Sequence, residues 1–343
     1  MGDLASSDML PRAQGCLLGQ VAGDSLGSLV EFATPEQIEH RYPGGPRKLE
    51  AGGVWGTLAG QPTDDSEMAL ALARCLIAQG RFDDEAVAQA YIEWLASGPF
   101  DIGGTTLTAL NAAAKAHQAG GAGARGAREA AKRDSQANGC LMRISPLGVF
   151  AASASSAEIW EWACVDASLT HPHPVCLQCT ALFASAIAFG ISSGQGPEAI
   201  YAHARSIAEQ RQVESSVLET FAAARDRPPA DFLHPQGWVL IAFQNAFYQL
   251  LHAATLEFGV INTVRAGGDT DTNAAIAGAL LGAVFGVELV PEQWAHSILN
   301  CRPRHGFLQV RRPRPERYWP VDLLSIAEDL LAAGRRAVRT AAP

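Results

Sequence analysis

The feature that most constrains the fold is a helical spacing of apolar residues. Met68 precedes Leu72 by four positions, and Leu72 precedes Cys75 and Leu76 by three and four. This spacing places all four side chains on one face of an α-helix. The same periodicity recurs in four further segments, which are Glu85–Leu95, Thr180–Ile191, Val239–Leu256 and Leu323–Ala332. Clean alternation of apolar and polar residues is missing, and alanine, the best helix former, is abundant. The sequence therefore predicts an all-α protein.

Glycine, proline and polar residues interrupt this pattern at Tyr42–Gly60, Gly120–Gly126, Asp226–Gly237 and Arg302–Pro320. The second interruption, GGAGARG, is predicted to be a flexible loop. A chain of 343 residues suggests two domains at roughly 150 residues each. The connecting segments are short, however, and the two acidic motifs described below lie far apart in the sequence. We therefore predict one domain over residues 1–343, with core motifs at 15–290 and a C-terminal helical extension at 291–343.

Charge and cysteine content exclude some classes of function. The net charge of -9 argues against a nucleic-acid binder or a protein of anionic membranes, because both need a cationic face. The first residues lack the basic and apolar regions of a secretory signal, and no stretch is convincing as a membrane span. Seven irregularly spaced cysteines indicate reduced thiols. We expect a cytoplasmic protein with no nucleic-acid or membrane partner.

One cluster of positive charge departs from this acidic balance. It consists of Arg311, Arg312, Arg314 and Arg317, with prolines between them. We interpret the cluster as a solvated surface stretch, and docking of a partner is the alternative. The sequence does not reveal the role of the wider 302–320 segment.

The first acidic motif is Thr63-Asp64-Asp65-Ser66, directly before a predicted helix. Carboxylates at such a position cap free N–H groups and complement the helix dipole. The alternative is a cation site, because a hydroxyl and two carboxylates are the oxygen ligands that Mg²⁺ or Mn²⁺ prefers. A helical Mg²⁺-dependent prenyl-transfer enzyme is a rival interpretation, but its DDxxD pattern requires an acid where Met68 stands.

The second acidic motif is GGDTDTN, which opens a helix that carries glycines at 278, 282 and 286. The two leading glycines allow a tight turn, and the spaced glycines predict a buried, closely packed helix. Carboxylates at the start of a buried helix are costly unless they are paired or bind metal. An EF-hand is excluded because Ala274 and Leu280 replace its glycine and glutamate. Together the two motifs suggest a shared two-metal site.

Six segments in order resemble the ADP-ribosylglycohydrolase family, in particular its dinitrogenase reductase-activating glycohydrolase branch. They are residues 15–33 (GCLLGQVAGDSLGSLVEFA), 60–73 (GQPTDDSEMALALA), 101–106 (DIGGTT), 138–148 (NGCLMRISPLG), 170–174 (THPHP) and 265–283 (RAGGDTDTNAAIAGALLGA). The resemblance covers most of the first 290 residues, and the chain after about Pro291 carries little of it. It implies a compact, orthogonal multi-helix bundle with a central binuclear Mg²⁺ or Mn²⁺ site.

The resemblance also implies roles for individual residues. Thr63, Asp64 and Asp65 would bind one metal, Asp269 and Thr272 the other, and Asp271 would bridge them. Glu31 would act catalytically from a mobile loop, and Asp101 is either a second catalytic acid or a helix cap. Substrate would contact Asn138, Gly139 and Met142 at the diphosphate and distal ribose, His171 at the adenosine, and Gly267 and Gly268.

The implied activity is hydrolysis of the bond between ADP-ribose and a protein side chain. ADP-ribosyl-arginine is expected over ADP-ribosyl-serine, with an ADP-ribosylated protein as substrate, free ADP-ribose as product and a monomeric enzyme. A module that binds ADP-ribose without turnover is the alternative.

Two departures from the family pattern stand out. Ala137 precedes Asn138 where glycine is usual, and Gly104 replaces a frequent polar residue. A zinc cluster of His171, His173, Cys176 and Cys179 is a weaker interpretation, since the thiols would face a helix core.

Overall fold

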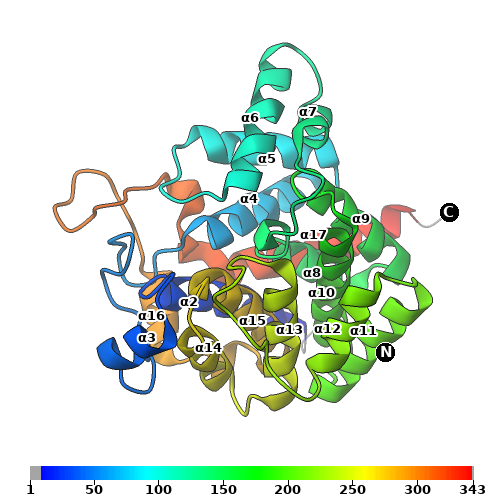
Figure 1. Ribbon diagram of the computed structural model, residues 1–343. Coiled ribbons are helices and arrows are strands. Elements are labelled where there is room, and N and C mark those ends of the chain that lie inside the picture. Colours follow the sequence, from blue (N-terminus) through cyan, green and yellow to red (C-terminus); the bar gives the residue numbers. More distant parts are fainter. Residues whose placement is uncertain (1–8, 342–343) are drawn as a thin grey trace.

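The computed structural model describes residues 9–341, and the regular structure in this range is helical (Figure 1). It holds sixteen α-helices, five 3₁₀ turns and two isolated β-bridges, but no strand within the described range. The all-α prediction is confirmed. The helices are α2 (Met9–Gly27), α3 (Pro35–Arg41), α4 (Asp64–Gln79), α5 (Asp84–Ala96), α6 (Gly104–Gln118), α7 (Gly123–Ala130), α8 (Ser145–Phe150), α9 (Ser156–Ser168), α10 (Pro174–Ser193), α11 (Pro197–Gln210), α12 (Ser215–Ala223), α13 (Val239–His252), α14 (Leu256–Arg265), α15 (Thr270–Phe285), α16 (Glu292–Leu299) and α17 (Leu323–Ala341).

Helices α2 and α15 pack backbone to backbone in the middle of the molecule (Figure 1). Glycines recur every fourth residue on both, and the two stripes face each other. A Cβ atom added to Gly278 would lie 2.1 Å from the carbonyl oxygen of Gly19, and one added to Gly282 would lie 1.9 Å from that of Gly15. Only glycine permits this approach. The prediction of a buried, closely packed helix is confirmed for α15, and its partner stripe on α2 was not foreseen.

The remaining helices surround this pair. In Figure 1, α5, α6 and α7 form the upper part of the view, and α10, α11 and α12 lie at the lower right. Helix α10 is long and apolar enough to cross a membrane by length and composition alone. However, 78% of its most apolar window is buried inside the protein. That burial is what a core helix requires.

The predicted loop at Gly120–Gly126 is wrong in its second half, where α7 begins at Gly123. The Glu85 carboxylate accepts hydrogen bonds from the Gly123 and Ala124 N–H groups, at 2.6 and 2.9 Å. An acid from another helix thus satisfies the free donors of this helix start. Because this partner is distant in sequence, glycine content alone misled the prediction.

The C-terminal part of the chain joins the core. Helix α17 packs against α2, α4 and α8, and its Leu323, Ile326 and Leu330 are buried. The interpretation of the arginine cluster as solvated surface is wrong for Arg314, of which only 5% is exposed. Its guanidinium forms a buried ion pair with Glu67 at 2.7 Å, a contact that lies outside the reach of local sequence patterns.

Candidate active site

A cleft of about 370 Å³ gathers side chains from widely separated parts of the chain. Its walls come from the loop after α2, the starts of α4, α6 and α15, the 3₁₀ turn at Asn138, and the loop before α13. Its lining includes most of the residues predicted from the sequence. These are Glu31, Asp64, Asp101, Asn138, Gly139, Met142, His171, Asp269, Asp271 and Thr272.

The first acidic motif is held by a carboxylate from α2. Asp24 is fully buried and accepts hydrogen bonds from the backbone N–H groups of Thr63, at 3.0 Å, and Ser66, at 3.1 Å. It therefore caps the start of α4 in place of the usual local N-cap. This cap turns Asp64 into the cleft, whereas Thr63 and Asp65 lie behind the cleft wall with no exposed surface. Their role as metal ligands stays a prediction.

The second acidic motif depends on its two leading glycines. Gly267 and Gly268 have φ angles of 77° and 75°, and a Cβ atom on Gly268 would lie 2.2 Å from the Phe232 carbonyl oxygen. The resulting turn delivers Asp269 and Asp271 to the cleft. The glycines themselves are outside the cleft lining. In the structure they shape the turn, and their role as substrate-binding residues stays a prediction.

Glu31 lies on a short loop that is tied to this turn. The Phe32 N–H donates to the Gly268 carbonyl at 2.7 Å, and the Gly268 N–H donates to the Ala33 carbonyl at 3.0 Å. Phe32 adopts a φ angle of 62°, which is uncommon for a bulky residue. The indole Nε1–H of Trp55 donates to Glu31 Oε2 at 2.6 Å. These contacts hold the Glu31 carboxylate at the edge of the cleft.

Three carboxylates lie close enough together to share a cation. Oxygen atoms of Glu31, Asp269 and Asp271 all lie within 4.8 Å of one another, and all three residues are buried. Nearby, the Oδ1 atom of Asp65 is buried without a hydrogen-bond partner, which costs free energy unless something else satisfies it. A hard divalent cation takes oxygen ligands of this kind. The residues present therefore fit such an ion.

The electrostatics of the cluster support the same conclusion. Burial, and then repulsion from neighbouring carboxylates, raise the pKa values of Asp64, Asp65 and Asp271 well above the usual range. Burial and the charges of Asp101 and Asp269 raise the pKa of Glu31 to about 8. Because a bound cation is often the largest local charge, it would stabilise the ionised forms and oppose these shifts.

Asn138 connects the acidic cluster to the opposite wall. Its side-chain amide donates to Asp269 Oδ2 at 2.7 Å, and its backbone N–H donates to the Gly237 carbonyl at 2.9 Å. The preceding Ala137 has a φ angle of -73°, so no glycine is required there. Alanine is therefore accommodated without backbone strain at this position. Gly139 abuts His171, since a Cβ atom on it would lie 2.9 Å from the ring Cε1 atom.

The protonation of His171 follows from its neighbours. Arg143 NH1, which can only donate, bonds to the Thr170 hydroxyl oxygen at 2.8 Å. The Thr170 hydroxyl lies 2.7 Å from His171 Nδ1 and is free to donate its hydrogen there. The proton of the neutral imidazole then resides on Nε2, which lies beside Gly139. Burial and the charge of Arg143 lower the pKa of His171 to about 3, which keeps the ring neutral.

Asp101 lines the cleft, and its pKa is raised to about 6 by burial and by the charges of Asp24 and Asp269. It does not cap α6, whose N-cap is Gly103.

The proposed zinc cluster finds no support, because the one metal-compatible group within residues 9–341 is the acidic one.

The sequence of the chain matches the family described as ADP-ribosylglycohydrolase over residues 5–337. The chain belongs to the ADP-ribosylglycohydrolase family. It is therefore an enzyme of the hydrolase class. The match runs well past Pro291, so the expectation that the last fifty residues carry little resemblance to the family is wrong.

Individual relatives of this glycohydrolase agree with the family match. The chain is 30% identical over 283 residues to ADP-ribosyl-[dinitrogen reductase] glycohydrolase of Rhodospirillum rubrum, and the match covers 82% of this chain and 88% of the relative. It is 27% identical over 295 residues to ADP-ribosylarginine hydrolase Tri1 of Pseudomonas putida (strain GB-1), covering 86% and 76%. A solved structure, described as an ADP-ribosylglycohydrolase-related protein complex, has the same fold. It has a TM-score of 0.75 and 22% identity, covering 96% of this chain and 99% of that one.

Several residues of this glycohydrolase site were not predicted from the sequence. Gln236 and Gly237 complete the wall beside Asn138, yet they lie in an irregular loop without a motif. Trp55 supports Glu31 from another such loop. Arg143 is fully buried among polar partners. Only its position inside the NGCLMRISPLG segment could have marked it as important.

Proposed function

We propose that this glycohydrolase removes ADP-ribose from arginine side chains of modified proteins, with two divalent cations, Mg²⁺ or Mn²⁺, at the acidic cluster. The observation that carries the proposal is the convergence of carboxylates from four separate segments, at Glu31, Asp64, Asp101 and the pair Asp269 and Asp271, on one cleft. No fold needs so many buried acids in contact for stability alone, because mutual repulsion opposes it.

The cleft offers a complementary surface for ADP-ribose. The diphosphate would lie against the Asn138–Gly139 turn, where the backbone N–H of Gly139 can approach a ligand closely. The neutral His171 would donate from Nε2 toward the nucleoside part. The proximal ribose would then lie over the acidic cluster. This orientation brings the bond to the protein side chain next to Glu31.

The acids have distinct parts in this proposal. Asp64, Asp65, Asp269, Asp271 and the hydroxyls of Thr63 and Thr272 would hold the cations. When bound, two such ions supply a Lewis acid for the ribose hydroxyls and for a water molecule. Glu31 would move a proton between that water and the departing side chain, as carboxylates do when glycosidic bonds are cleaved.

The arginine preference rests on charge. A guanidinium is planar and cationic, and carboxylates bind it through charge-assisted hydrogen bonds. Glu31 and Asp101 form an acidic edge to the cleft, and two relatives are named for ADP-ribosyl-dinitrogen reductase and ADP-ribosylarginine. We further propose that the enzyme is a cytoplasmic monomer that acts on proteins and not on nucleic acid or membranes. Its net charge and its seven free cysteines support this.

The test is a comparison of matched peptides that carry ADP-ribose on arginine or on serine. We expect a higher kcat/KM on the arginine-linked peptide. A serine preference of tenfold or more, about 1.4 kcal/mol in transition-state binding, would refute the linkage while leaving the family intact. Binding of ADP-ribose without release from either peptide would show a binding module instead.

A further inference from the structure

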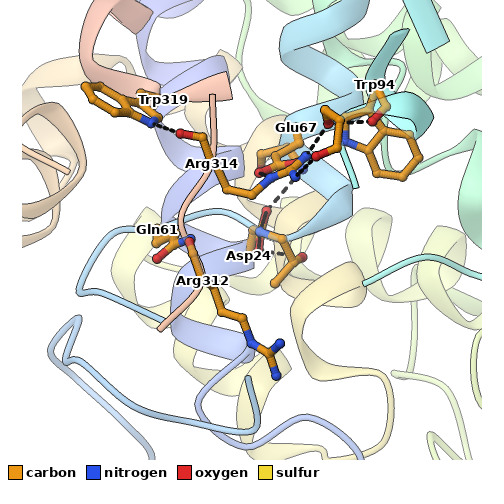
Figure 2. A network of polar contacts seen from close by, with 10 residues as sticks. Asp24, Gln61, Glu67, Trp94, Arg312, Arg314 and Trp319 are labelled. Carbon is orange, nitrogen blue, oxygen red and sulfur yellow. Dashed lines mark hydrogen bonds and ion pairs between the residues drawn. The ribbon is translucent and has the colours of Figure 1, made fainter. Parts of the chain in front are cut away.

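The segment between α16 and α17, residues 302–320, contacts Trp55, Gln61 and Glu67, and we call it the C-terminal strap. The Gln61 side-chain amide donates to the Arg312 carbonyl at 2.7 Å. Figure 2 shows Arg312 and Arg314 on this segment with diverging side chains, Arg314 directed at Glu67 and Arg312 directed away from it. The strap therefore has two separate points of attachment near the site.

Arg314 is the anchor of the strap. Its Nε and NH2 atoms donate to the two oxygens of Glu67, each at 2.7 Å, and NH1 donates to the Ser97 carbonyl at 3.0 Å. The Trp94 indole donates to the same Glu67 carboxylate at 2.9 Å. A buried ion pair is tolerated when its polar atoms are satisfied in this way. Because Glu67 lies in the first turn of α4, the anchor is three residues from Asp64.

Arg312 holds Trp55 in two ways. Its Nε atom donates to the Trp55 backbone carbonyl at 2.9 Å. Its guanidinium lies 5.9 Å from the Trp55 ring centre and 5.7 Å from that of Phe100, within the range of cation–π attraction. The two rings are themselves 5.9 Å apart. The Trp55 ring is thus fixed between the strap and the loop that carries Asp101.

Trp55 in turn contacts Glu31 through the 2.6 Å hydrogen bond from its indole Nε1–H. Trp55 lies in the irregular segment between α3 and α4, where no helix orders its side chain. We propose that Arg312 and Trp55 are positioning residues, and that the strap orients the Glu31 carboxylate through them. This inference rests on the proposed function only in giving Glu31 a role at the substrate.

The first test is kinetic. Trp55→Phe keeps an aromatic ring and removes the donor. We expect kcat on the arginine-linked peptide to fall about 10²-fold, the effect of roughly 1 Å of misplacement, with KM and ADP-ribose affinity unchanged. In a Glu31→Gln background the same change should have little further effect, because residues acting through one another are not additive. If Trp55→Phe lowered kcat by the same factor in the Glu31→Gln background as in the unaltered enzyme, the proposal would be overturned.

The second test does not depend on activity. The Trp55 indole ¹⁵N–¹H resonance, identified as the one lost in Trp55→Phe, reports the bond to Glu31. Arg312→Met should shift this resonance and lower kcat, whereas Arg302→Met, which removes the same charge from an exposed strap residue whose guanidinium donates to the Asn300 carbonyl, should do neither. If the Trp55 indole resonance did not move in Arg312→Met, the proposal that the strap positions Trp55 would be refuted. If the unaltered enzyme released no ADP-ribose from any peptide, the proposed function would fail, and this resonance would still decide the structural claim.

Discussion

At the scale of single residues, the cleft is organised by side chains that lie outside its lining. Asp24 caps α4 from another helix, and Arg143 directs the Thr170 hydroxyl to His171. The residue types in the cleft could be predicted from acidic and Asn-Gly motifs. The partners of the supporting side chains could not, because each of these contacts joins segments that lie far apart in the chain.

The tautomer of His171 gives the first prediction. Thr170→Val keeps the shape of the side chain and removes the hydroxyl donor to Nδ1. We expect ADP-ribose affinity to fall about tenfold, the value of roughly one hydrogen bond, in isothermal titration calorimetry. Thr170→Ser, which retains a hydroxyl, serves as the control and should bind normally. Unchanged affinity and unchanged imidazole ¹⁵N shifts in Thr170→Val would contradict the assignment.

A second prediction concerns Asp271, which is 2% exposed and belongs to the three-carboxylate cluster. Asp271→Ala should reduce release of ADP-ribose to the background of a buffer control, because it removes the proposed ligand of both cations. The far-ultraviolet circular dichroism spectrum should stay helical, since the α2–α15 contact does not use this carboxylate. Near-normal release with unchanged metal dependence would rule out the two-metal proposal.

At the scale of elements, the close approach of α2 and α15 brings the site together. Thr270 donates from its hydroxyl to the Gly27 carbonyl at 2.7 Å, so the end of α2 meets the start of α15. Spacing alone predicted parts of α4, α5, α10, α13 and α17, together with the glycine stripe of α15. It could not reveal which helix receives that stripe, because glycine spacing indicates a closely packed face on a helix but not which other face it meets.

The third prediction tests this contact. Gly278→Ala places a methyl group where the Gly19 carbonyl lies 2.1 Å away, so the helices must separate. We expect the free energy of unfolding to fall by about 1–3 kcal/mol, as for other overpacked cores, in urea denaturation. Gly196→Ala is the matched control, because its Cβ atom would meet nothing within 4 Å. Equal losses in the two variants would show that the contact is not the cause.

At the scale of the whole molecule, the buried acids oppose folding when they ionise. The pKa of Glu31 is raised to about 8, and those of Asp24 and Asp101 to about 6, mainly by burial. Each folded-state value lies above the ordinary one near 4. The folded protein therefore holds extra protons between about pH 4 and pH 8, and its stability falls as the pH rises through this window. The expectation that residues 1–343 form one domain stays a prediction.

The fourth prediction follows from this sign. In EDTA, Tm should fall as the pH is raised from 5 to 8, because the acids ionise without a counter-charge. Saturating Mg²⁺ or Mn²⁺ should raise Tm more at pH 8 than at pH 6, since protons and metal compete for the same oxygens. Differential scanning calorimetry at matched ionic strength measures both effects. A Tm gain independent of pH would mean that the cations bind elsewhere.

The most direct measurement of the central claim is release of ADP-ribose by metal-stripped enzyme during titration with Mg²⁺ or Mn²⁺. The substrate is an ADP-ribosyl-arginine peptide, and bound metal is counted in the same samples. We predict no release without metal and full activity when two ions are bound per chain. Full release by enzyme that contains no divalent metal would contradict the claim that the acidic cluster is a catalytic cation site.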